Sequence, residues 1–360
     1  FTGFMEEISL LVSIRKITGR LLFRGQNQKN AMKIKTTLFF GIVFLITAAA
    51  TPWFGVESIK PLQVWNQLLG NPSPQGIIFW FQRIPRVILA LLAGGTLALV
   101  GASFQALFRN PLVEPYTLGI SGGAALGAFM AISIPSLWIT WGPFSSIQLL
   151  AVCGAAISLG FIYSLSKKPE GLSIYTILLA GVTISIICGG IILFLTYITS
   201  PNALIIFQRW MMGGVDIAGF KEMASLIPLL IPGLAFLFFH ANDLNHISLG
   251  EDMALGHGVP VKKVQRNIFI GGGLSTAAVV SLVGPIGFIG LIVPHAVRRL
   301  AGFDQRTVLP CSFLLGGTAL AVCDTIARKI VPPTELPVGI ITAVIGGPLF
   351  IRLLISRRWK

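Results

Sequence analysis

The sequence predicts an all-α membrane protein with ten transmembrane helices. Hydrophobic residues make up 54% of the 360 residues and charged residues only 11%, whereas a soluble domain carries about 25% charged residues. Long runs without Asp, Glu, Lys or Arg recur along the chain, and a membrane-spanning helix needs about 20 mostly apolar residues. Short basic clusters separate these runs. The natural solvent of this chain is therefore a bilayer rather than water.

The ten spans follow from the apolar runs, two of which must be divided. The run 115–166 is too long for one helix and is interrupted at "IPSLWITWGPFSS" (134–146). The run 267–297 is interrupted at "VGPIG" (283–287), where Gly and Pro stop a helix. Residues between 197 and "RWMMGGVD" are expected to form a re-entrant or surface piece. The expected spans are 36–55, 87–108, 117–134, 147–166, 173–197, 223–240, 267–283, 287–300, 307–327 and 337–355.

The basic residues predict the topology. The net charge of +14 forms no single patch, because the Lys and Arg residues lie in short clusters between the apolar runs. This arrangement favours lipid headgroups and topology control over nucleic-acid binding. Placing the N-terminus in the cytoplasm puts most of the 27 Lys and Arg residues inside, as the positive-inside rule requires. Both termini are then cytoplasmic, and Arg298 and Arg299 are stop signals at the inner end of a helix.

Two parts are expected in the chain. Residues 1–35 are basic and polar and lack a small-residue cleavage site after an apolar core, so they predict a cytoplasmic segment rather than a signal peptide. Part of this segment is a candidate artefact of the assigned gene start. Residues 36–360 form the transmembrane domain. Its small-residue stretches, such as "AGGTLALVGAS" (93–103) and "FLLGGTALA" (313–321), let helices pack closely in lipid.

The sequence offers no catalytic residues, no metal site and no cofactor site. It has no GxxxxGK[ST] phosphate loop, no HExxH and no GxSxG, so it cannot use ATP through such a loop. Ion-coupled carriers generally need ionisable residues deep in their helices, and Asp324 is the one candidate within the expected spans. A passive pore, or a carrier energised from outside the chain, therefore fits better than an ion-coupled carrier.

Three basic residues oppose the positive-inside trend, and one loop is long enough to bind a partner. Arg83 and Arg86, in "FQRIPRVIL", and Arg328, in "DTIARKI", either snorkel to the headgroups or form a cationic rim for an acidic extracytoplasmic partner. The loop 241–266 has a helix-like core from Leu249 to Leu255 and a glycine stop at Gly256. It is either a plain connection or a docking surface for a soluble protein.

Three long segments resemble the FecCD family of permease subunits, which serve ABC importers of iron–siderophore complexes, haem and cobalamin. They are "RIPRVILALLAGGTLALVGASFQALFRNPLVEPYTLGISGGAALGA" (83–128), "GFIGLIVPHAVRRLAGFDQRTVLP" (287–310) and "ELPVGIITAVIGGPLFIRLL" (335–354). The match extends from about residue 36 to the C-terminus. The resemblance implies a type II ABC importer permease fold with inverted repeats in the bacterial inner membrane. It also implies a homodimer, two cytoplasmic ATP-binding subunits and a periplasmic or lipid-anchored substrate-binding protein.

The resemblance also assigns site residues. Arg83, Arg86 and Arg328 match basic positions that dock the binding protein. Ile174 and Tyr175 match the cytoplasmic gate, where the cobalamin importer has small hydroxyl residues, so their gate chemistry differs. His295 matches a family signature position and is expected to be structural. The positions implied to couple to the ATPase are Leu249, Gly250, Glu251, Ala254, Leu255 and Gly256.

The function implied is that of a transport subunit without an ATPase site of its own. The expected cargo is an iron(III)–siderophore complex, with cobalamin or haem as alternatives in the same importer class. "WMMGG" (210–214) resembles the cobalamin permease more than many siderophore permeases. Two other classes stay open on the residues alone: an ATP-independent secondary carrier and a membrane anchor for a redox complex.

Overall fold

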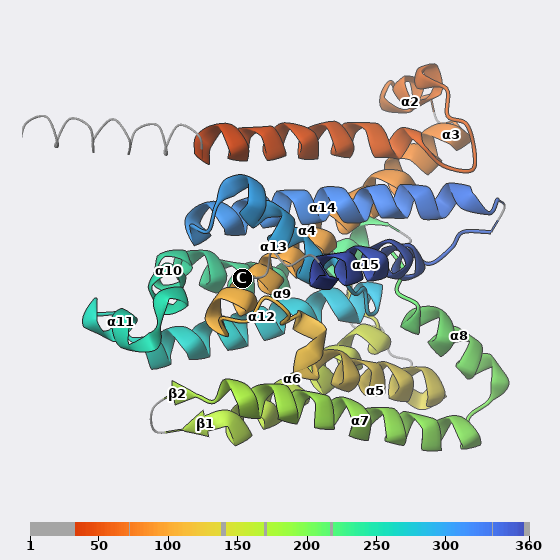
Figure 1. Cartoon of the computed structure of the whole chain (residues 1–360). Helices are drawn as coiled ribbons and strands as arrows, with labels where there is room; N and C mark the ends of the chain where they lie inside the picture. The colour runs from red at the N-terminus through yellow and green to blue at the C-terminus, as the bar shows by residue number, and fades with distance from the viewer. Residues whose placement is uncertain are drawn as a thin grey trace, which may run out of the picture.

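The computed structural model describes residues 33–355 except 72, 138–141, 169–170, 217–218 and 333. Most of the expected N-terminal segment, residues 1–32, lies outside the described residues. Figure 1 shows long helices lying roughly side by side, from the N-terminal helix through α14 and α4 to α5, α6 and α7. The short helices α2 and α3 lie at one end of this bundle, and α10 and α11 lie at the opposite end.

The described residues are almost entirely helical. The N-terminal span, Lys33–Trp53, ends in η1 (Thr51–Trp53). A two-residue strand pair, β1 (Lys167–Lys168) and β2 (Gly171–Leu172), is antiparallel. The other short turns are η2 (Ile78–Arg83), η3 (Pro115–Leu118) and η4 (Pro135–Leu137). The α-helices that follow the N-terminal span are α2 (Pro61–Leu68), α3 (Pro74–Ile77), α4 (Ile84–Leu107), α5 (Ile120–Ser133), α6 (Ser146–Ser166), α7 (Ile174–Ile198), α8 (Pro201–Met211), α9 (Phe220–Phe239), α10 (Ala241–Leu249), α11 (Glu251–Gly256), α12 (Val261–Val283), α13 (Ile289–Ala301), α14 (Gln305–Ile330) and α15 (Val338–Ile355).

Each expected span coincides with a helix, but not every helix is long enough to cross a bilayer. In the described part of the chain, 7 helices are long and apolar enough, while α5 and α15 are shorter apolar helices. Helix α13 has 13 residues, or about 20 Å at 1.5 Å per residue, against a hydrocarbon core of about 30 Å. Ten crossings therefore stay a prediction. Helix α8 confirms the extra piece expected after residue 197.

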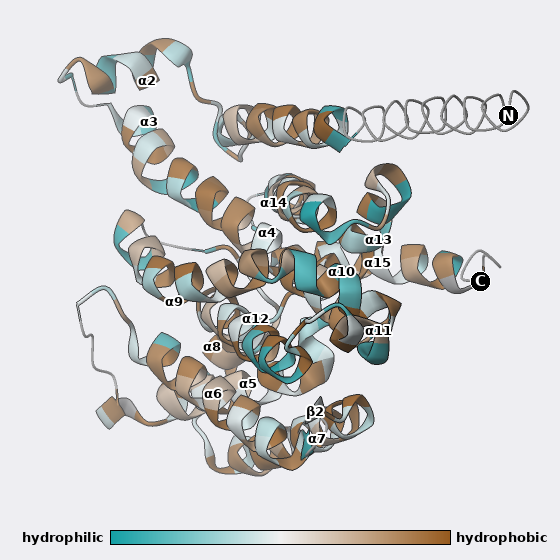
Figure 2. Ribbon diagram, turned by 90° about the vertical axis from the view of Figure 1, so that its left-hand side faces the viewer, coloured by the Kyte–Doolittle hydropathy of each residue, from teal (hydrophilic) through white to brown (hydrophobic). Residues whose placement is uncertain are grey.

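The second span begins earlier than the apolar run predicts. Helices α3, η2 and α4 form one continuous span, Pro74–Leu107, whose most apolar window is 89% buried. The apolar run predicts a start at residue 87, with Arg83 and Arg86 as its boundary. The structure buries both side chains against partners, so the helix continues through them. Figure 2 shows mainly hydrophobic residues along these long helices and a mixture of hydrophilic and hydrophobic residues on α10 and α11.

Small residues set the closest helix crossings, as the sequence predicts. A Cβ atom added to Gly94 on α4 would clash with the carbonyl oxygen of Gly316 on α14. Similarly, a Cβ atom added to Gly154 on α6 would clash with the carbonyl oxygen of Gly123 on α5. Contact this close is available only between helices without side chains at the crossing. It makes α4 the centre of the bundle, with α14, α12 and α13 packed around it.

The expected helix across 249–255 is wrong in one respect. Helix α10 ends at Leu249 and α11 begins at Glu251, with Gly250 between them at φ 134° and ψ 149°. This backbone conformation is open to glycine and strained for residues with a Cβ atom. The chain therefore turns between two short helices, while the helix end expected at Gly256 is confirmed.

Candidate docking and coupling surfaces at the two ends of the bundle

A charged cluster lies at the end of the bundle that carries α2. We define the Asp324 cluster as Arg83, Arg86, Asp324, Arg328 and Glu335. The side chain of Asp324, on α14, is 1% exposed. Arg86 donates to both carboxylate oxygens of Asp324, with Nη2 2.9 Å and Nε 3.1 Å from Oδ1 and Nε 3.2 Å from Oδ2. Nε of Arg328, one helical turn later, lies 3.1 Å from Oδ2. One buried carboxylate therefore pairs with two guanidinium groups.

Arg83 and Arg328 also bind backbone carbonyls at the end of the N-terminal span and in the loop that follows it. Arg83 donates to the backbone carbonyls of Pro52 at 3.2 Å and Glu57 at 2.5 Å. Arg328 Nη1 donates to the carbonyl of Phe54 at 3.0 Å. Arg83 and Arg328 are only 7% and 2% exposed. The expectation of a free cationic rim is therefore wrong for these two residues, because burial requires their charges to be satisfied within the protein.

Arg86 connects the buried part of the cluster to the surface. Its Nη1 lies 2.5 Å from Glu335 Oε2 and its Nη2 lies 3.3 Å from Asp216 Oδ1. The side chains of Glu335 and Asp216 are 37% and 44% exposed. A pocket of about 450 Å³, which Glu57 and Gln82 also line, opens above the cluster. The exposed surface around Arg86 is thus of mixed charge. The i,i+4 spacing of Asp324 and Arg328 was the sequence signal for their pairing.

The opposite end of the bundle presents an apolar surface on α10 and α11. Leu249, Met253 and Leu255 are 71%, 55% and 58% exposed. These helices project from the end of the bundle (Figure 1), beyond the long apolar helices. We define the α10–α11 surface as these three side chains. The exposure of Met253 is not predicted by the sequence, because acidic residues precede it in the chain and the turn at Gly250 has no clear sequence signal.

The other expected coupling residues hold this surface in place. Ala254 is fully buried. Glu251 accepts a hydrogen bond at 3.0 Å from Nε2 of Gln265 on α12. Gly250 makes the turn described above, and Gly256 ends α11. Of the six expected coupling residues, the two leucines are therefore exposed side chains. The other four determine the path of the backbone that carries them.

Asp304 fixes α10 against the start of α14. We define the Asp304 cluster as Lys33, Asn245 and Asp304. Asp304 caps α14 and accepts hydrogen bonds from Lys33 Nζ at 2.6 Å and Asn245 Nδ2 at 2.8 Å. Partial burial raises the pKa of Asp304, but its hydrogen bonds to Lys33, Asn245 and the Arg306 amide outweigh this effect, so the pKa is lowered.

Glu114 is a half-buried carboxyl group in the turn between α4 and α5. Its Oε1 accepts a hydrogen bond of 2.9 Å from the backbone amide of Phe288, a residue held at φ 69°. Next to it, the Tyr116 hydroxyl accepts the amide of Ile286 at 2.9 Å. Burial raises the pKa of Glu114 to about 7, although the bond to Phe288 lowers it. The turn between α4 and α5 is thereby locked to the start of α13.

The expected gate residues begin α7. Ser173 caps this helix through the amide of Thr176, and Tyr175 is 77% exposed, while Ile174 is half-buried. A gate at Ile174 and Tyr175 stays a prediction. His295 lies elsewhere, in a pocket of about 730 Å³ that Arg299 and Arg352 also line. Within the described ranges, no group of 3 or more His, Cys, Asp or Glu side chains is arranged to hold a metal ion.

Comparison with known proteins places this geometry in a family. The FecCD transport family matches residues 37–356. The cobalamin import system permease protein BtuC of Halobacterium salinarum is 36% identical over 314 residues, covering 87% of this chain and 82% of that protein. The hemin transport system permease protein HmuU of Yersinia pestis is 34% identical, covering 89% and 95%. A solved structure described as an inward-facing metal-chelate type ABC transporter has a TM-score of 0.77 and 28% identity, covering 89% of this chain and 98% of that one. The chain therefore belongs to the FecCD transport family.

Proposed function

We propose that this FecCD-family permease translocates an iron(III)–siderophore complex across the bacterial inner membrane, as part of a binding-protein-dependent ABC importer. The observation that carries the mechanism is the pairing of Asp324 with Arg86 and Arg328. Asp324 is the buried carboxylate found within the described candidate spans, and an ion-coupled carrier needs a carboxylate that can change its charge. Because two guanidinium groups hold Asp324 in its charged form, it does not meet this requirement. The energy for transport is therefore proposed to come from separate ATP-binding subunits.

The α10–α11 surface is the proposed contact with two cytoplasmic ATP-binding subunits. Exposed apolar side chains outside a membrane span are typical of protein–protein contacts. Leu249, Met253 and Leu255 supply such a contact, and Glu251 and Ala254 hold it against α12. This assignment puts the start of the N-terminal span on the cytoplasmic side, because Lys33 pairs with Asp304 at the same end of the bundle. With the ten crossings that the sequence predicts, both chain termini are then cytoplasmic.

The mixed-charge pocket above Arg86 is the proposed docking site for a periplasmic or lipid-anchored binding protein. Arg83 and Arg328 form its buried floor, so they act by holding the surface rather than by meeting the partner directly. Glu335 and Asp216 are the exposed charges around Arg86. A second copy of the permease completes the pathway, with Ile174 and Tyr175 at its cytoplasmic gate.

Cobalamin and haem are the second candidates for the cargo. They are supported by relatives whose names specify cobalamin and hemin. All three cargoes carry a metal ion that is already bound by an organic chelator. A permease for such a cargo needs a wide pathway rather than metal ligands of its own.

The test is a transport measurement with the whole importer reconstituted in proteoliposomes. ATP is supplied on the side of the vesicle that carries the ATP-binding subunits. Radiolabelled ferric siderophore is offered with unlabelled haem or cobalamin as competitor, and a hydrolysis-deficient ATPase partner is the control. Iron uptake that survives both competitors and disappears with the control supports the proposal. Uptake lost to one competitor changes the cargo, and uptake independent of the ATPase overturns the mechanism.

A further inference from the structure

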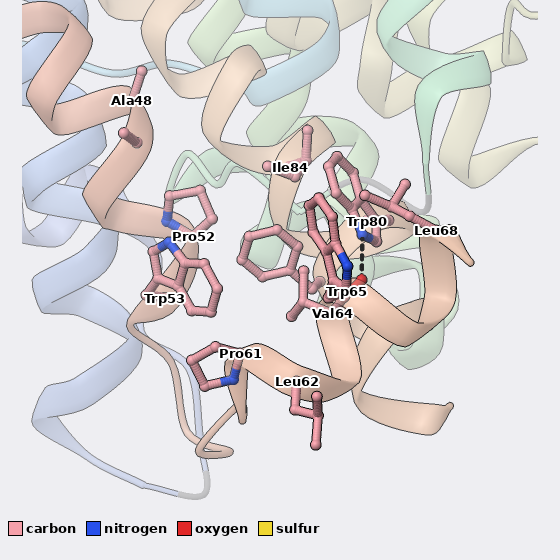
Figure 3. A pocket seen from close by; sticks show the side chains of 12 residues that line it. Ala48, Pro52, Trp53, Pro61, Leu62, Val64, Trp65, Leu68, Trp80 and Ile84 are labelled. Carbon is pink, nitrogen blue, oxygen red and sulfur yellow. Dashed lines mark hydrogen bonds between the residues drawn. The ribbon is translucent and has the colours of Figure 1, made fainter. Parts of the chain in front are cut away.

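An apolar pocket of about 660 Å³ lies between the end of the N-terminal span, α2 and η2. Figure 3 shows its walls, which include Pro52, Trp53, Val64, Trp65 and Trp80. The volume falls within the range of roughly 300–1,000 Å³ that is typical of small-molecule sites. The pocket is separate from the Asp324 cluster and from the α10–α11 surface, and the proposed transport mechanism does not use it.

The walls of the pocket are held in place by aromatic contacts. The rings of Trp53 and Phe79 are 4.7 Å apart, and Phe79 meets Trp80 edge to face at 5.5 Å. Trp80 Nε1 donates to the carbonyl of Val64 at 3.3 Å (Figure 3). Phe79 and Val64 are 5% and 6% exposed. The pocket is therefore built into the fold rather than left by a loose loop.

Its position is that of a membrane interface. The pocket closes the end of a candidate span, and tryptophans concentrate where spans meet the headgroups. Trp53 and Trp65 are 40% and 61% exposed. Helix α2 also exposes Leu62 and Leu68, at 70% and 57%. A short helix with an exposed apolar side at the end of a span is typical of helices that lie in the plane of the interface.

The lipid-facing surface of the N-terminal span leads directly into this pocket. Only 17% of the most apolar window of that span is buried within the chain. Leu45 and Ile46 are exposed on it, and one turn further on Ala48 and Ala49 line the pocket. A hydrocarbon chain that follows this helix therefore enters the pocket without crossing a polar surface.

A cation adjoins the pocket in the chain. Lys60 is exposed, precedes the pocket-lining residue Pro61 and forms the N-cap of α2. An ammonium group at the interface complements the phosphate of a lipid headgroup. We propose that the pocket binds one membrane phospholipid, with an acyl chain inside it and the headgroup phosphate beside Lys60.

The bound lipid would contact the backbone that binds Arg83 of the Asp324 cluster. Arg83 donates to the carbonyls of Pro52 and Trp53 at 3.2 and 3.4 Å, and both of these residues line the pocket. An acyl chain packed against them fixes the carbonyl groups that satisfy the buried guanidinium. The lipid site is therefore coupled to the outer surface of the permease without taking part in cargo transfer.

The test is native mass spectrometry of the whole transporter, purified in mild detergent and exposed to phosphatidylglycerol. The wild-type chain should retain one phospholipid per permease copy. Ala48→Phe fills the pocket, and excluding even two methylene groups from burial corresponds to about a tenfold loss of affinity. The matched control is Leu45→Phe on the same helix outside the pocket, which should retain lipid like the wild type.

Lys60→Glu provides a second variant that leaves the apolar packing untouched. It should lower lipid retention several-fold even where Ala48→Phe fails to assemble. Equal retention of lipid by the wild type, Ala48→Phe and Lys60→Glu would overturn the proposal. A wild-type transporter that retains no phospholipid would overturn it too. The measurement uses no cargo, so its outcome is independent of the proposal about the transported chelate.

Discussion

The negative charge of an aspartate is compensated differently at the two ends of α14. Each end carries an aspartate that joins segments distant in sequence: Asp324 binds Arg86 and Arg328, and Asp304 binds Lys33 and Asn245. The side chain of Asp324 is 1% exposed, whereas that of Asp304 is 27% exposed. The buried aspartate has two guanidinium partners. The half-buried one accepts hydrogen bonds from the ammonium group of Lys33, the side-chain amide of Asn245 and the backbone amide of Arg306.

This difference separates a fixed end of the molecule from an adjustable one. A buried ion pair that loses one partner leaves an unpaired charge in a poorly polarisable interior. The Asp324 cluster must therefore stay assembled, and it binds the N-terminal span, α4 and α14 as one unit. A solvated pair exchanges its partners for water at little cost. The Asp304 cluster can therefore rearrange with α10 at a lower cost than the Asp324 cluster.

The largest expected effect is at the buried end. Asp324→Asn leaves Arg86 and Arg328 without their shared counter-charge, so the free energy of unfolding should fall by about 3–5 kcal/mol. Denaturant unfolding in detergent measures this change. Asp216→Asn is the matched control, because Asp216 contacts the same Arg86 at 3.3 Å but is 44% exposed; its effect should stay below about 1 kcal/mol. Equal effects of the two variants would break the comparison.

Glu114 sharpens the comparison, because it is a half-buried carboxyl group bound by a backbone amide rather than by a cation. Its pKa of about 7 lies above the ordinary value of 4.5, so the folded state retains a proton that the unfolded state releases. Stability should therefore decline as the pH rises from about 4.5 to 7, by on the order of 2 kcal/mol. Glu114→Gln should remove this dependence in unfolding curves measured across that range. An unchanged pH profile would mean that Glu114 is solvated.

Sequence periodicity and composition predicted the helices well. They did not predict whether the charged side chains on these helices are buried or exposed. The apolar runs located every long helix, and small residues marked crossings such as Gly94 with Gly316. Arg83 and Arg328 were interpreted as surface groups, because a sequence shows a charge but not the carbonyls and carboxylates that surround it. The start of the second span was missed for the same reason. A helix boundary drawn at an arginine is correct only where that arginine reaches water.

The local backbone at the opposite end was also beyond sequence reasoning. The pattern from Leu249 to Leu255 predicts a helix that includes Gly250. In the structure Gly250, at φ 134°, separates α10 from α11, and Glu251 accepts a hydrogen bond from Gln265 on α12. Contacts between α10 and α14, which determine the orientation of the α10–α11 surface, join residues about 60 positions apart. No local pattern contains them.

The α10–α11 surface should separate activity from stability. Replacing Leu249 and Leu255 together with serine removes two exposed apolar contacts, so stability should change by less than about 0.5 kcal/mol. ATP hydrolysis stimulated by the binding protein should nevertheless fall about tenfold, as for loss of a central interface contact. Leu300→Ser is the control, since Leu300 is 60% exposed but lies on α13. A loss of stability in the double variant would show that these leucines belong to the core.

The smallest expected effect is at Asp304, where the comparison predicts a mild response to acid. Its lowered pKa means that the folded state releases a proton more readily than the unfolded state. The stabilisation is therefore present above the unfolded pKa and is lost as the pH falls through the folded pKa. Asp304→Asn should lower the free energy of unfolding by about 1 kcal/mol at neutral pH and have no effect once Asp304 is protonated. Unfolding curves at neutral and acid pH measure this difference, with Lys33→Met as the partner variant. A loss as large as that of Asp324→Asn would show that both ends of α14 are equally fixed.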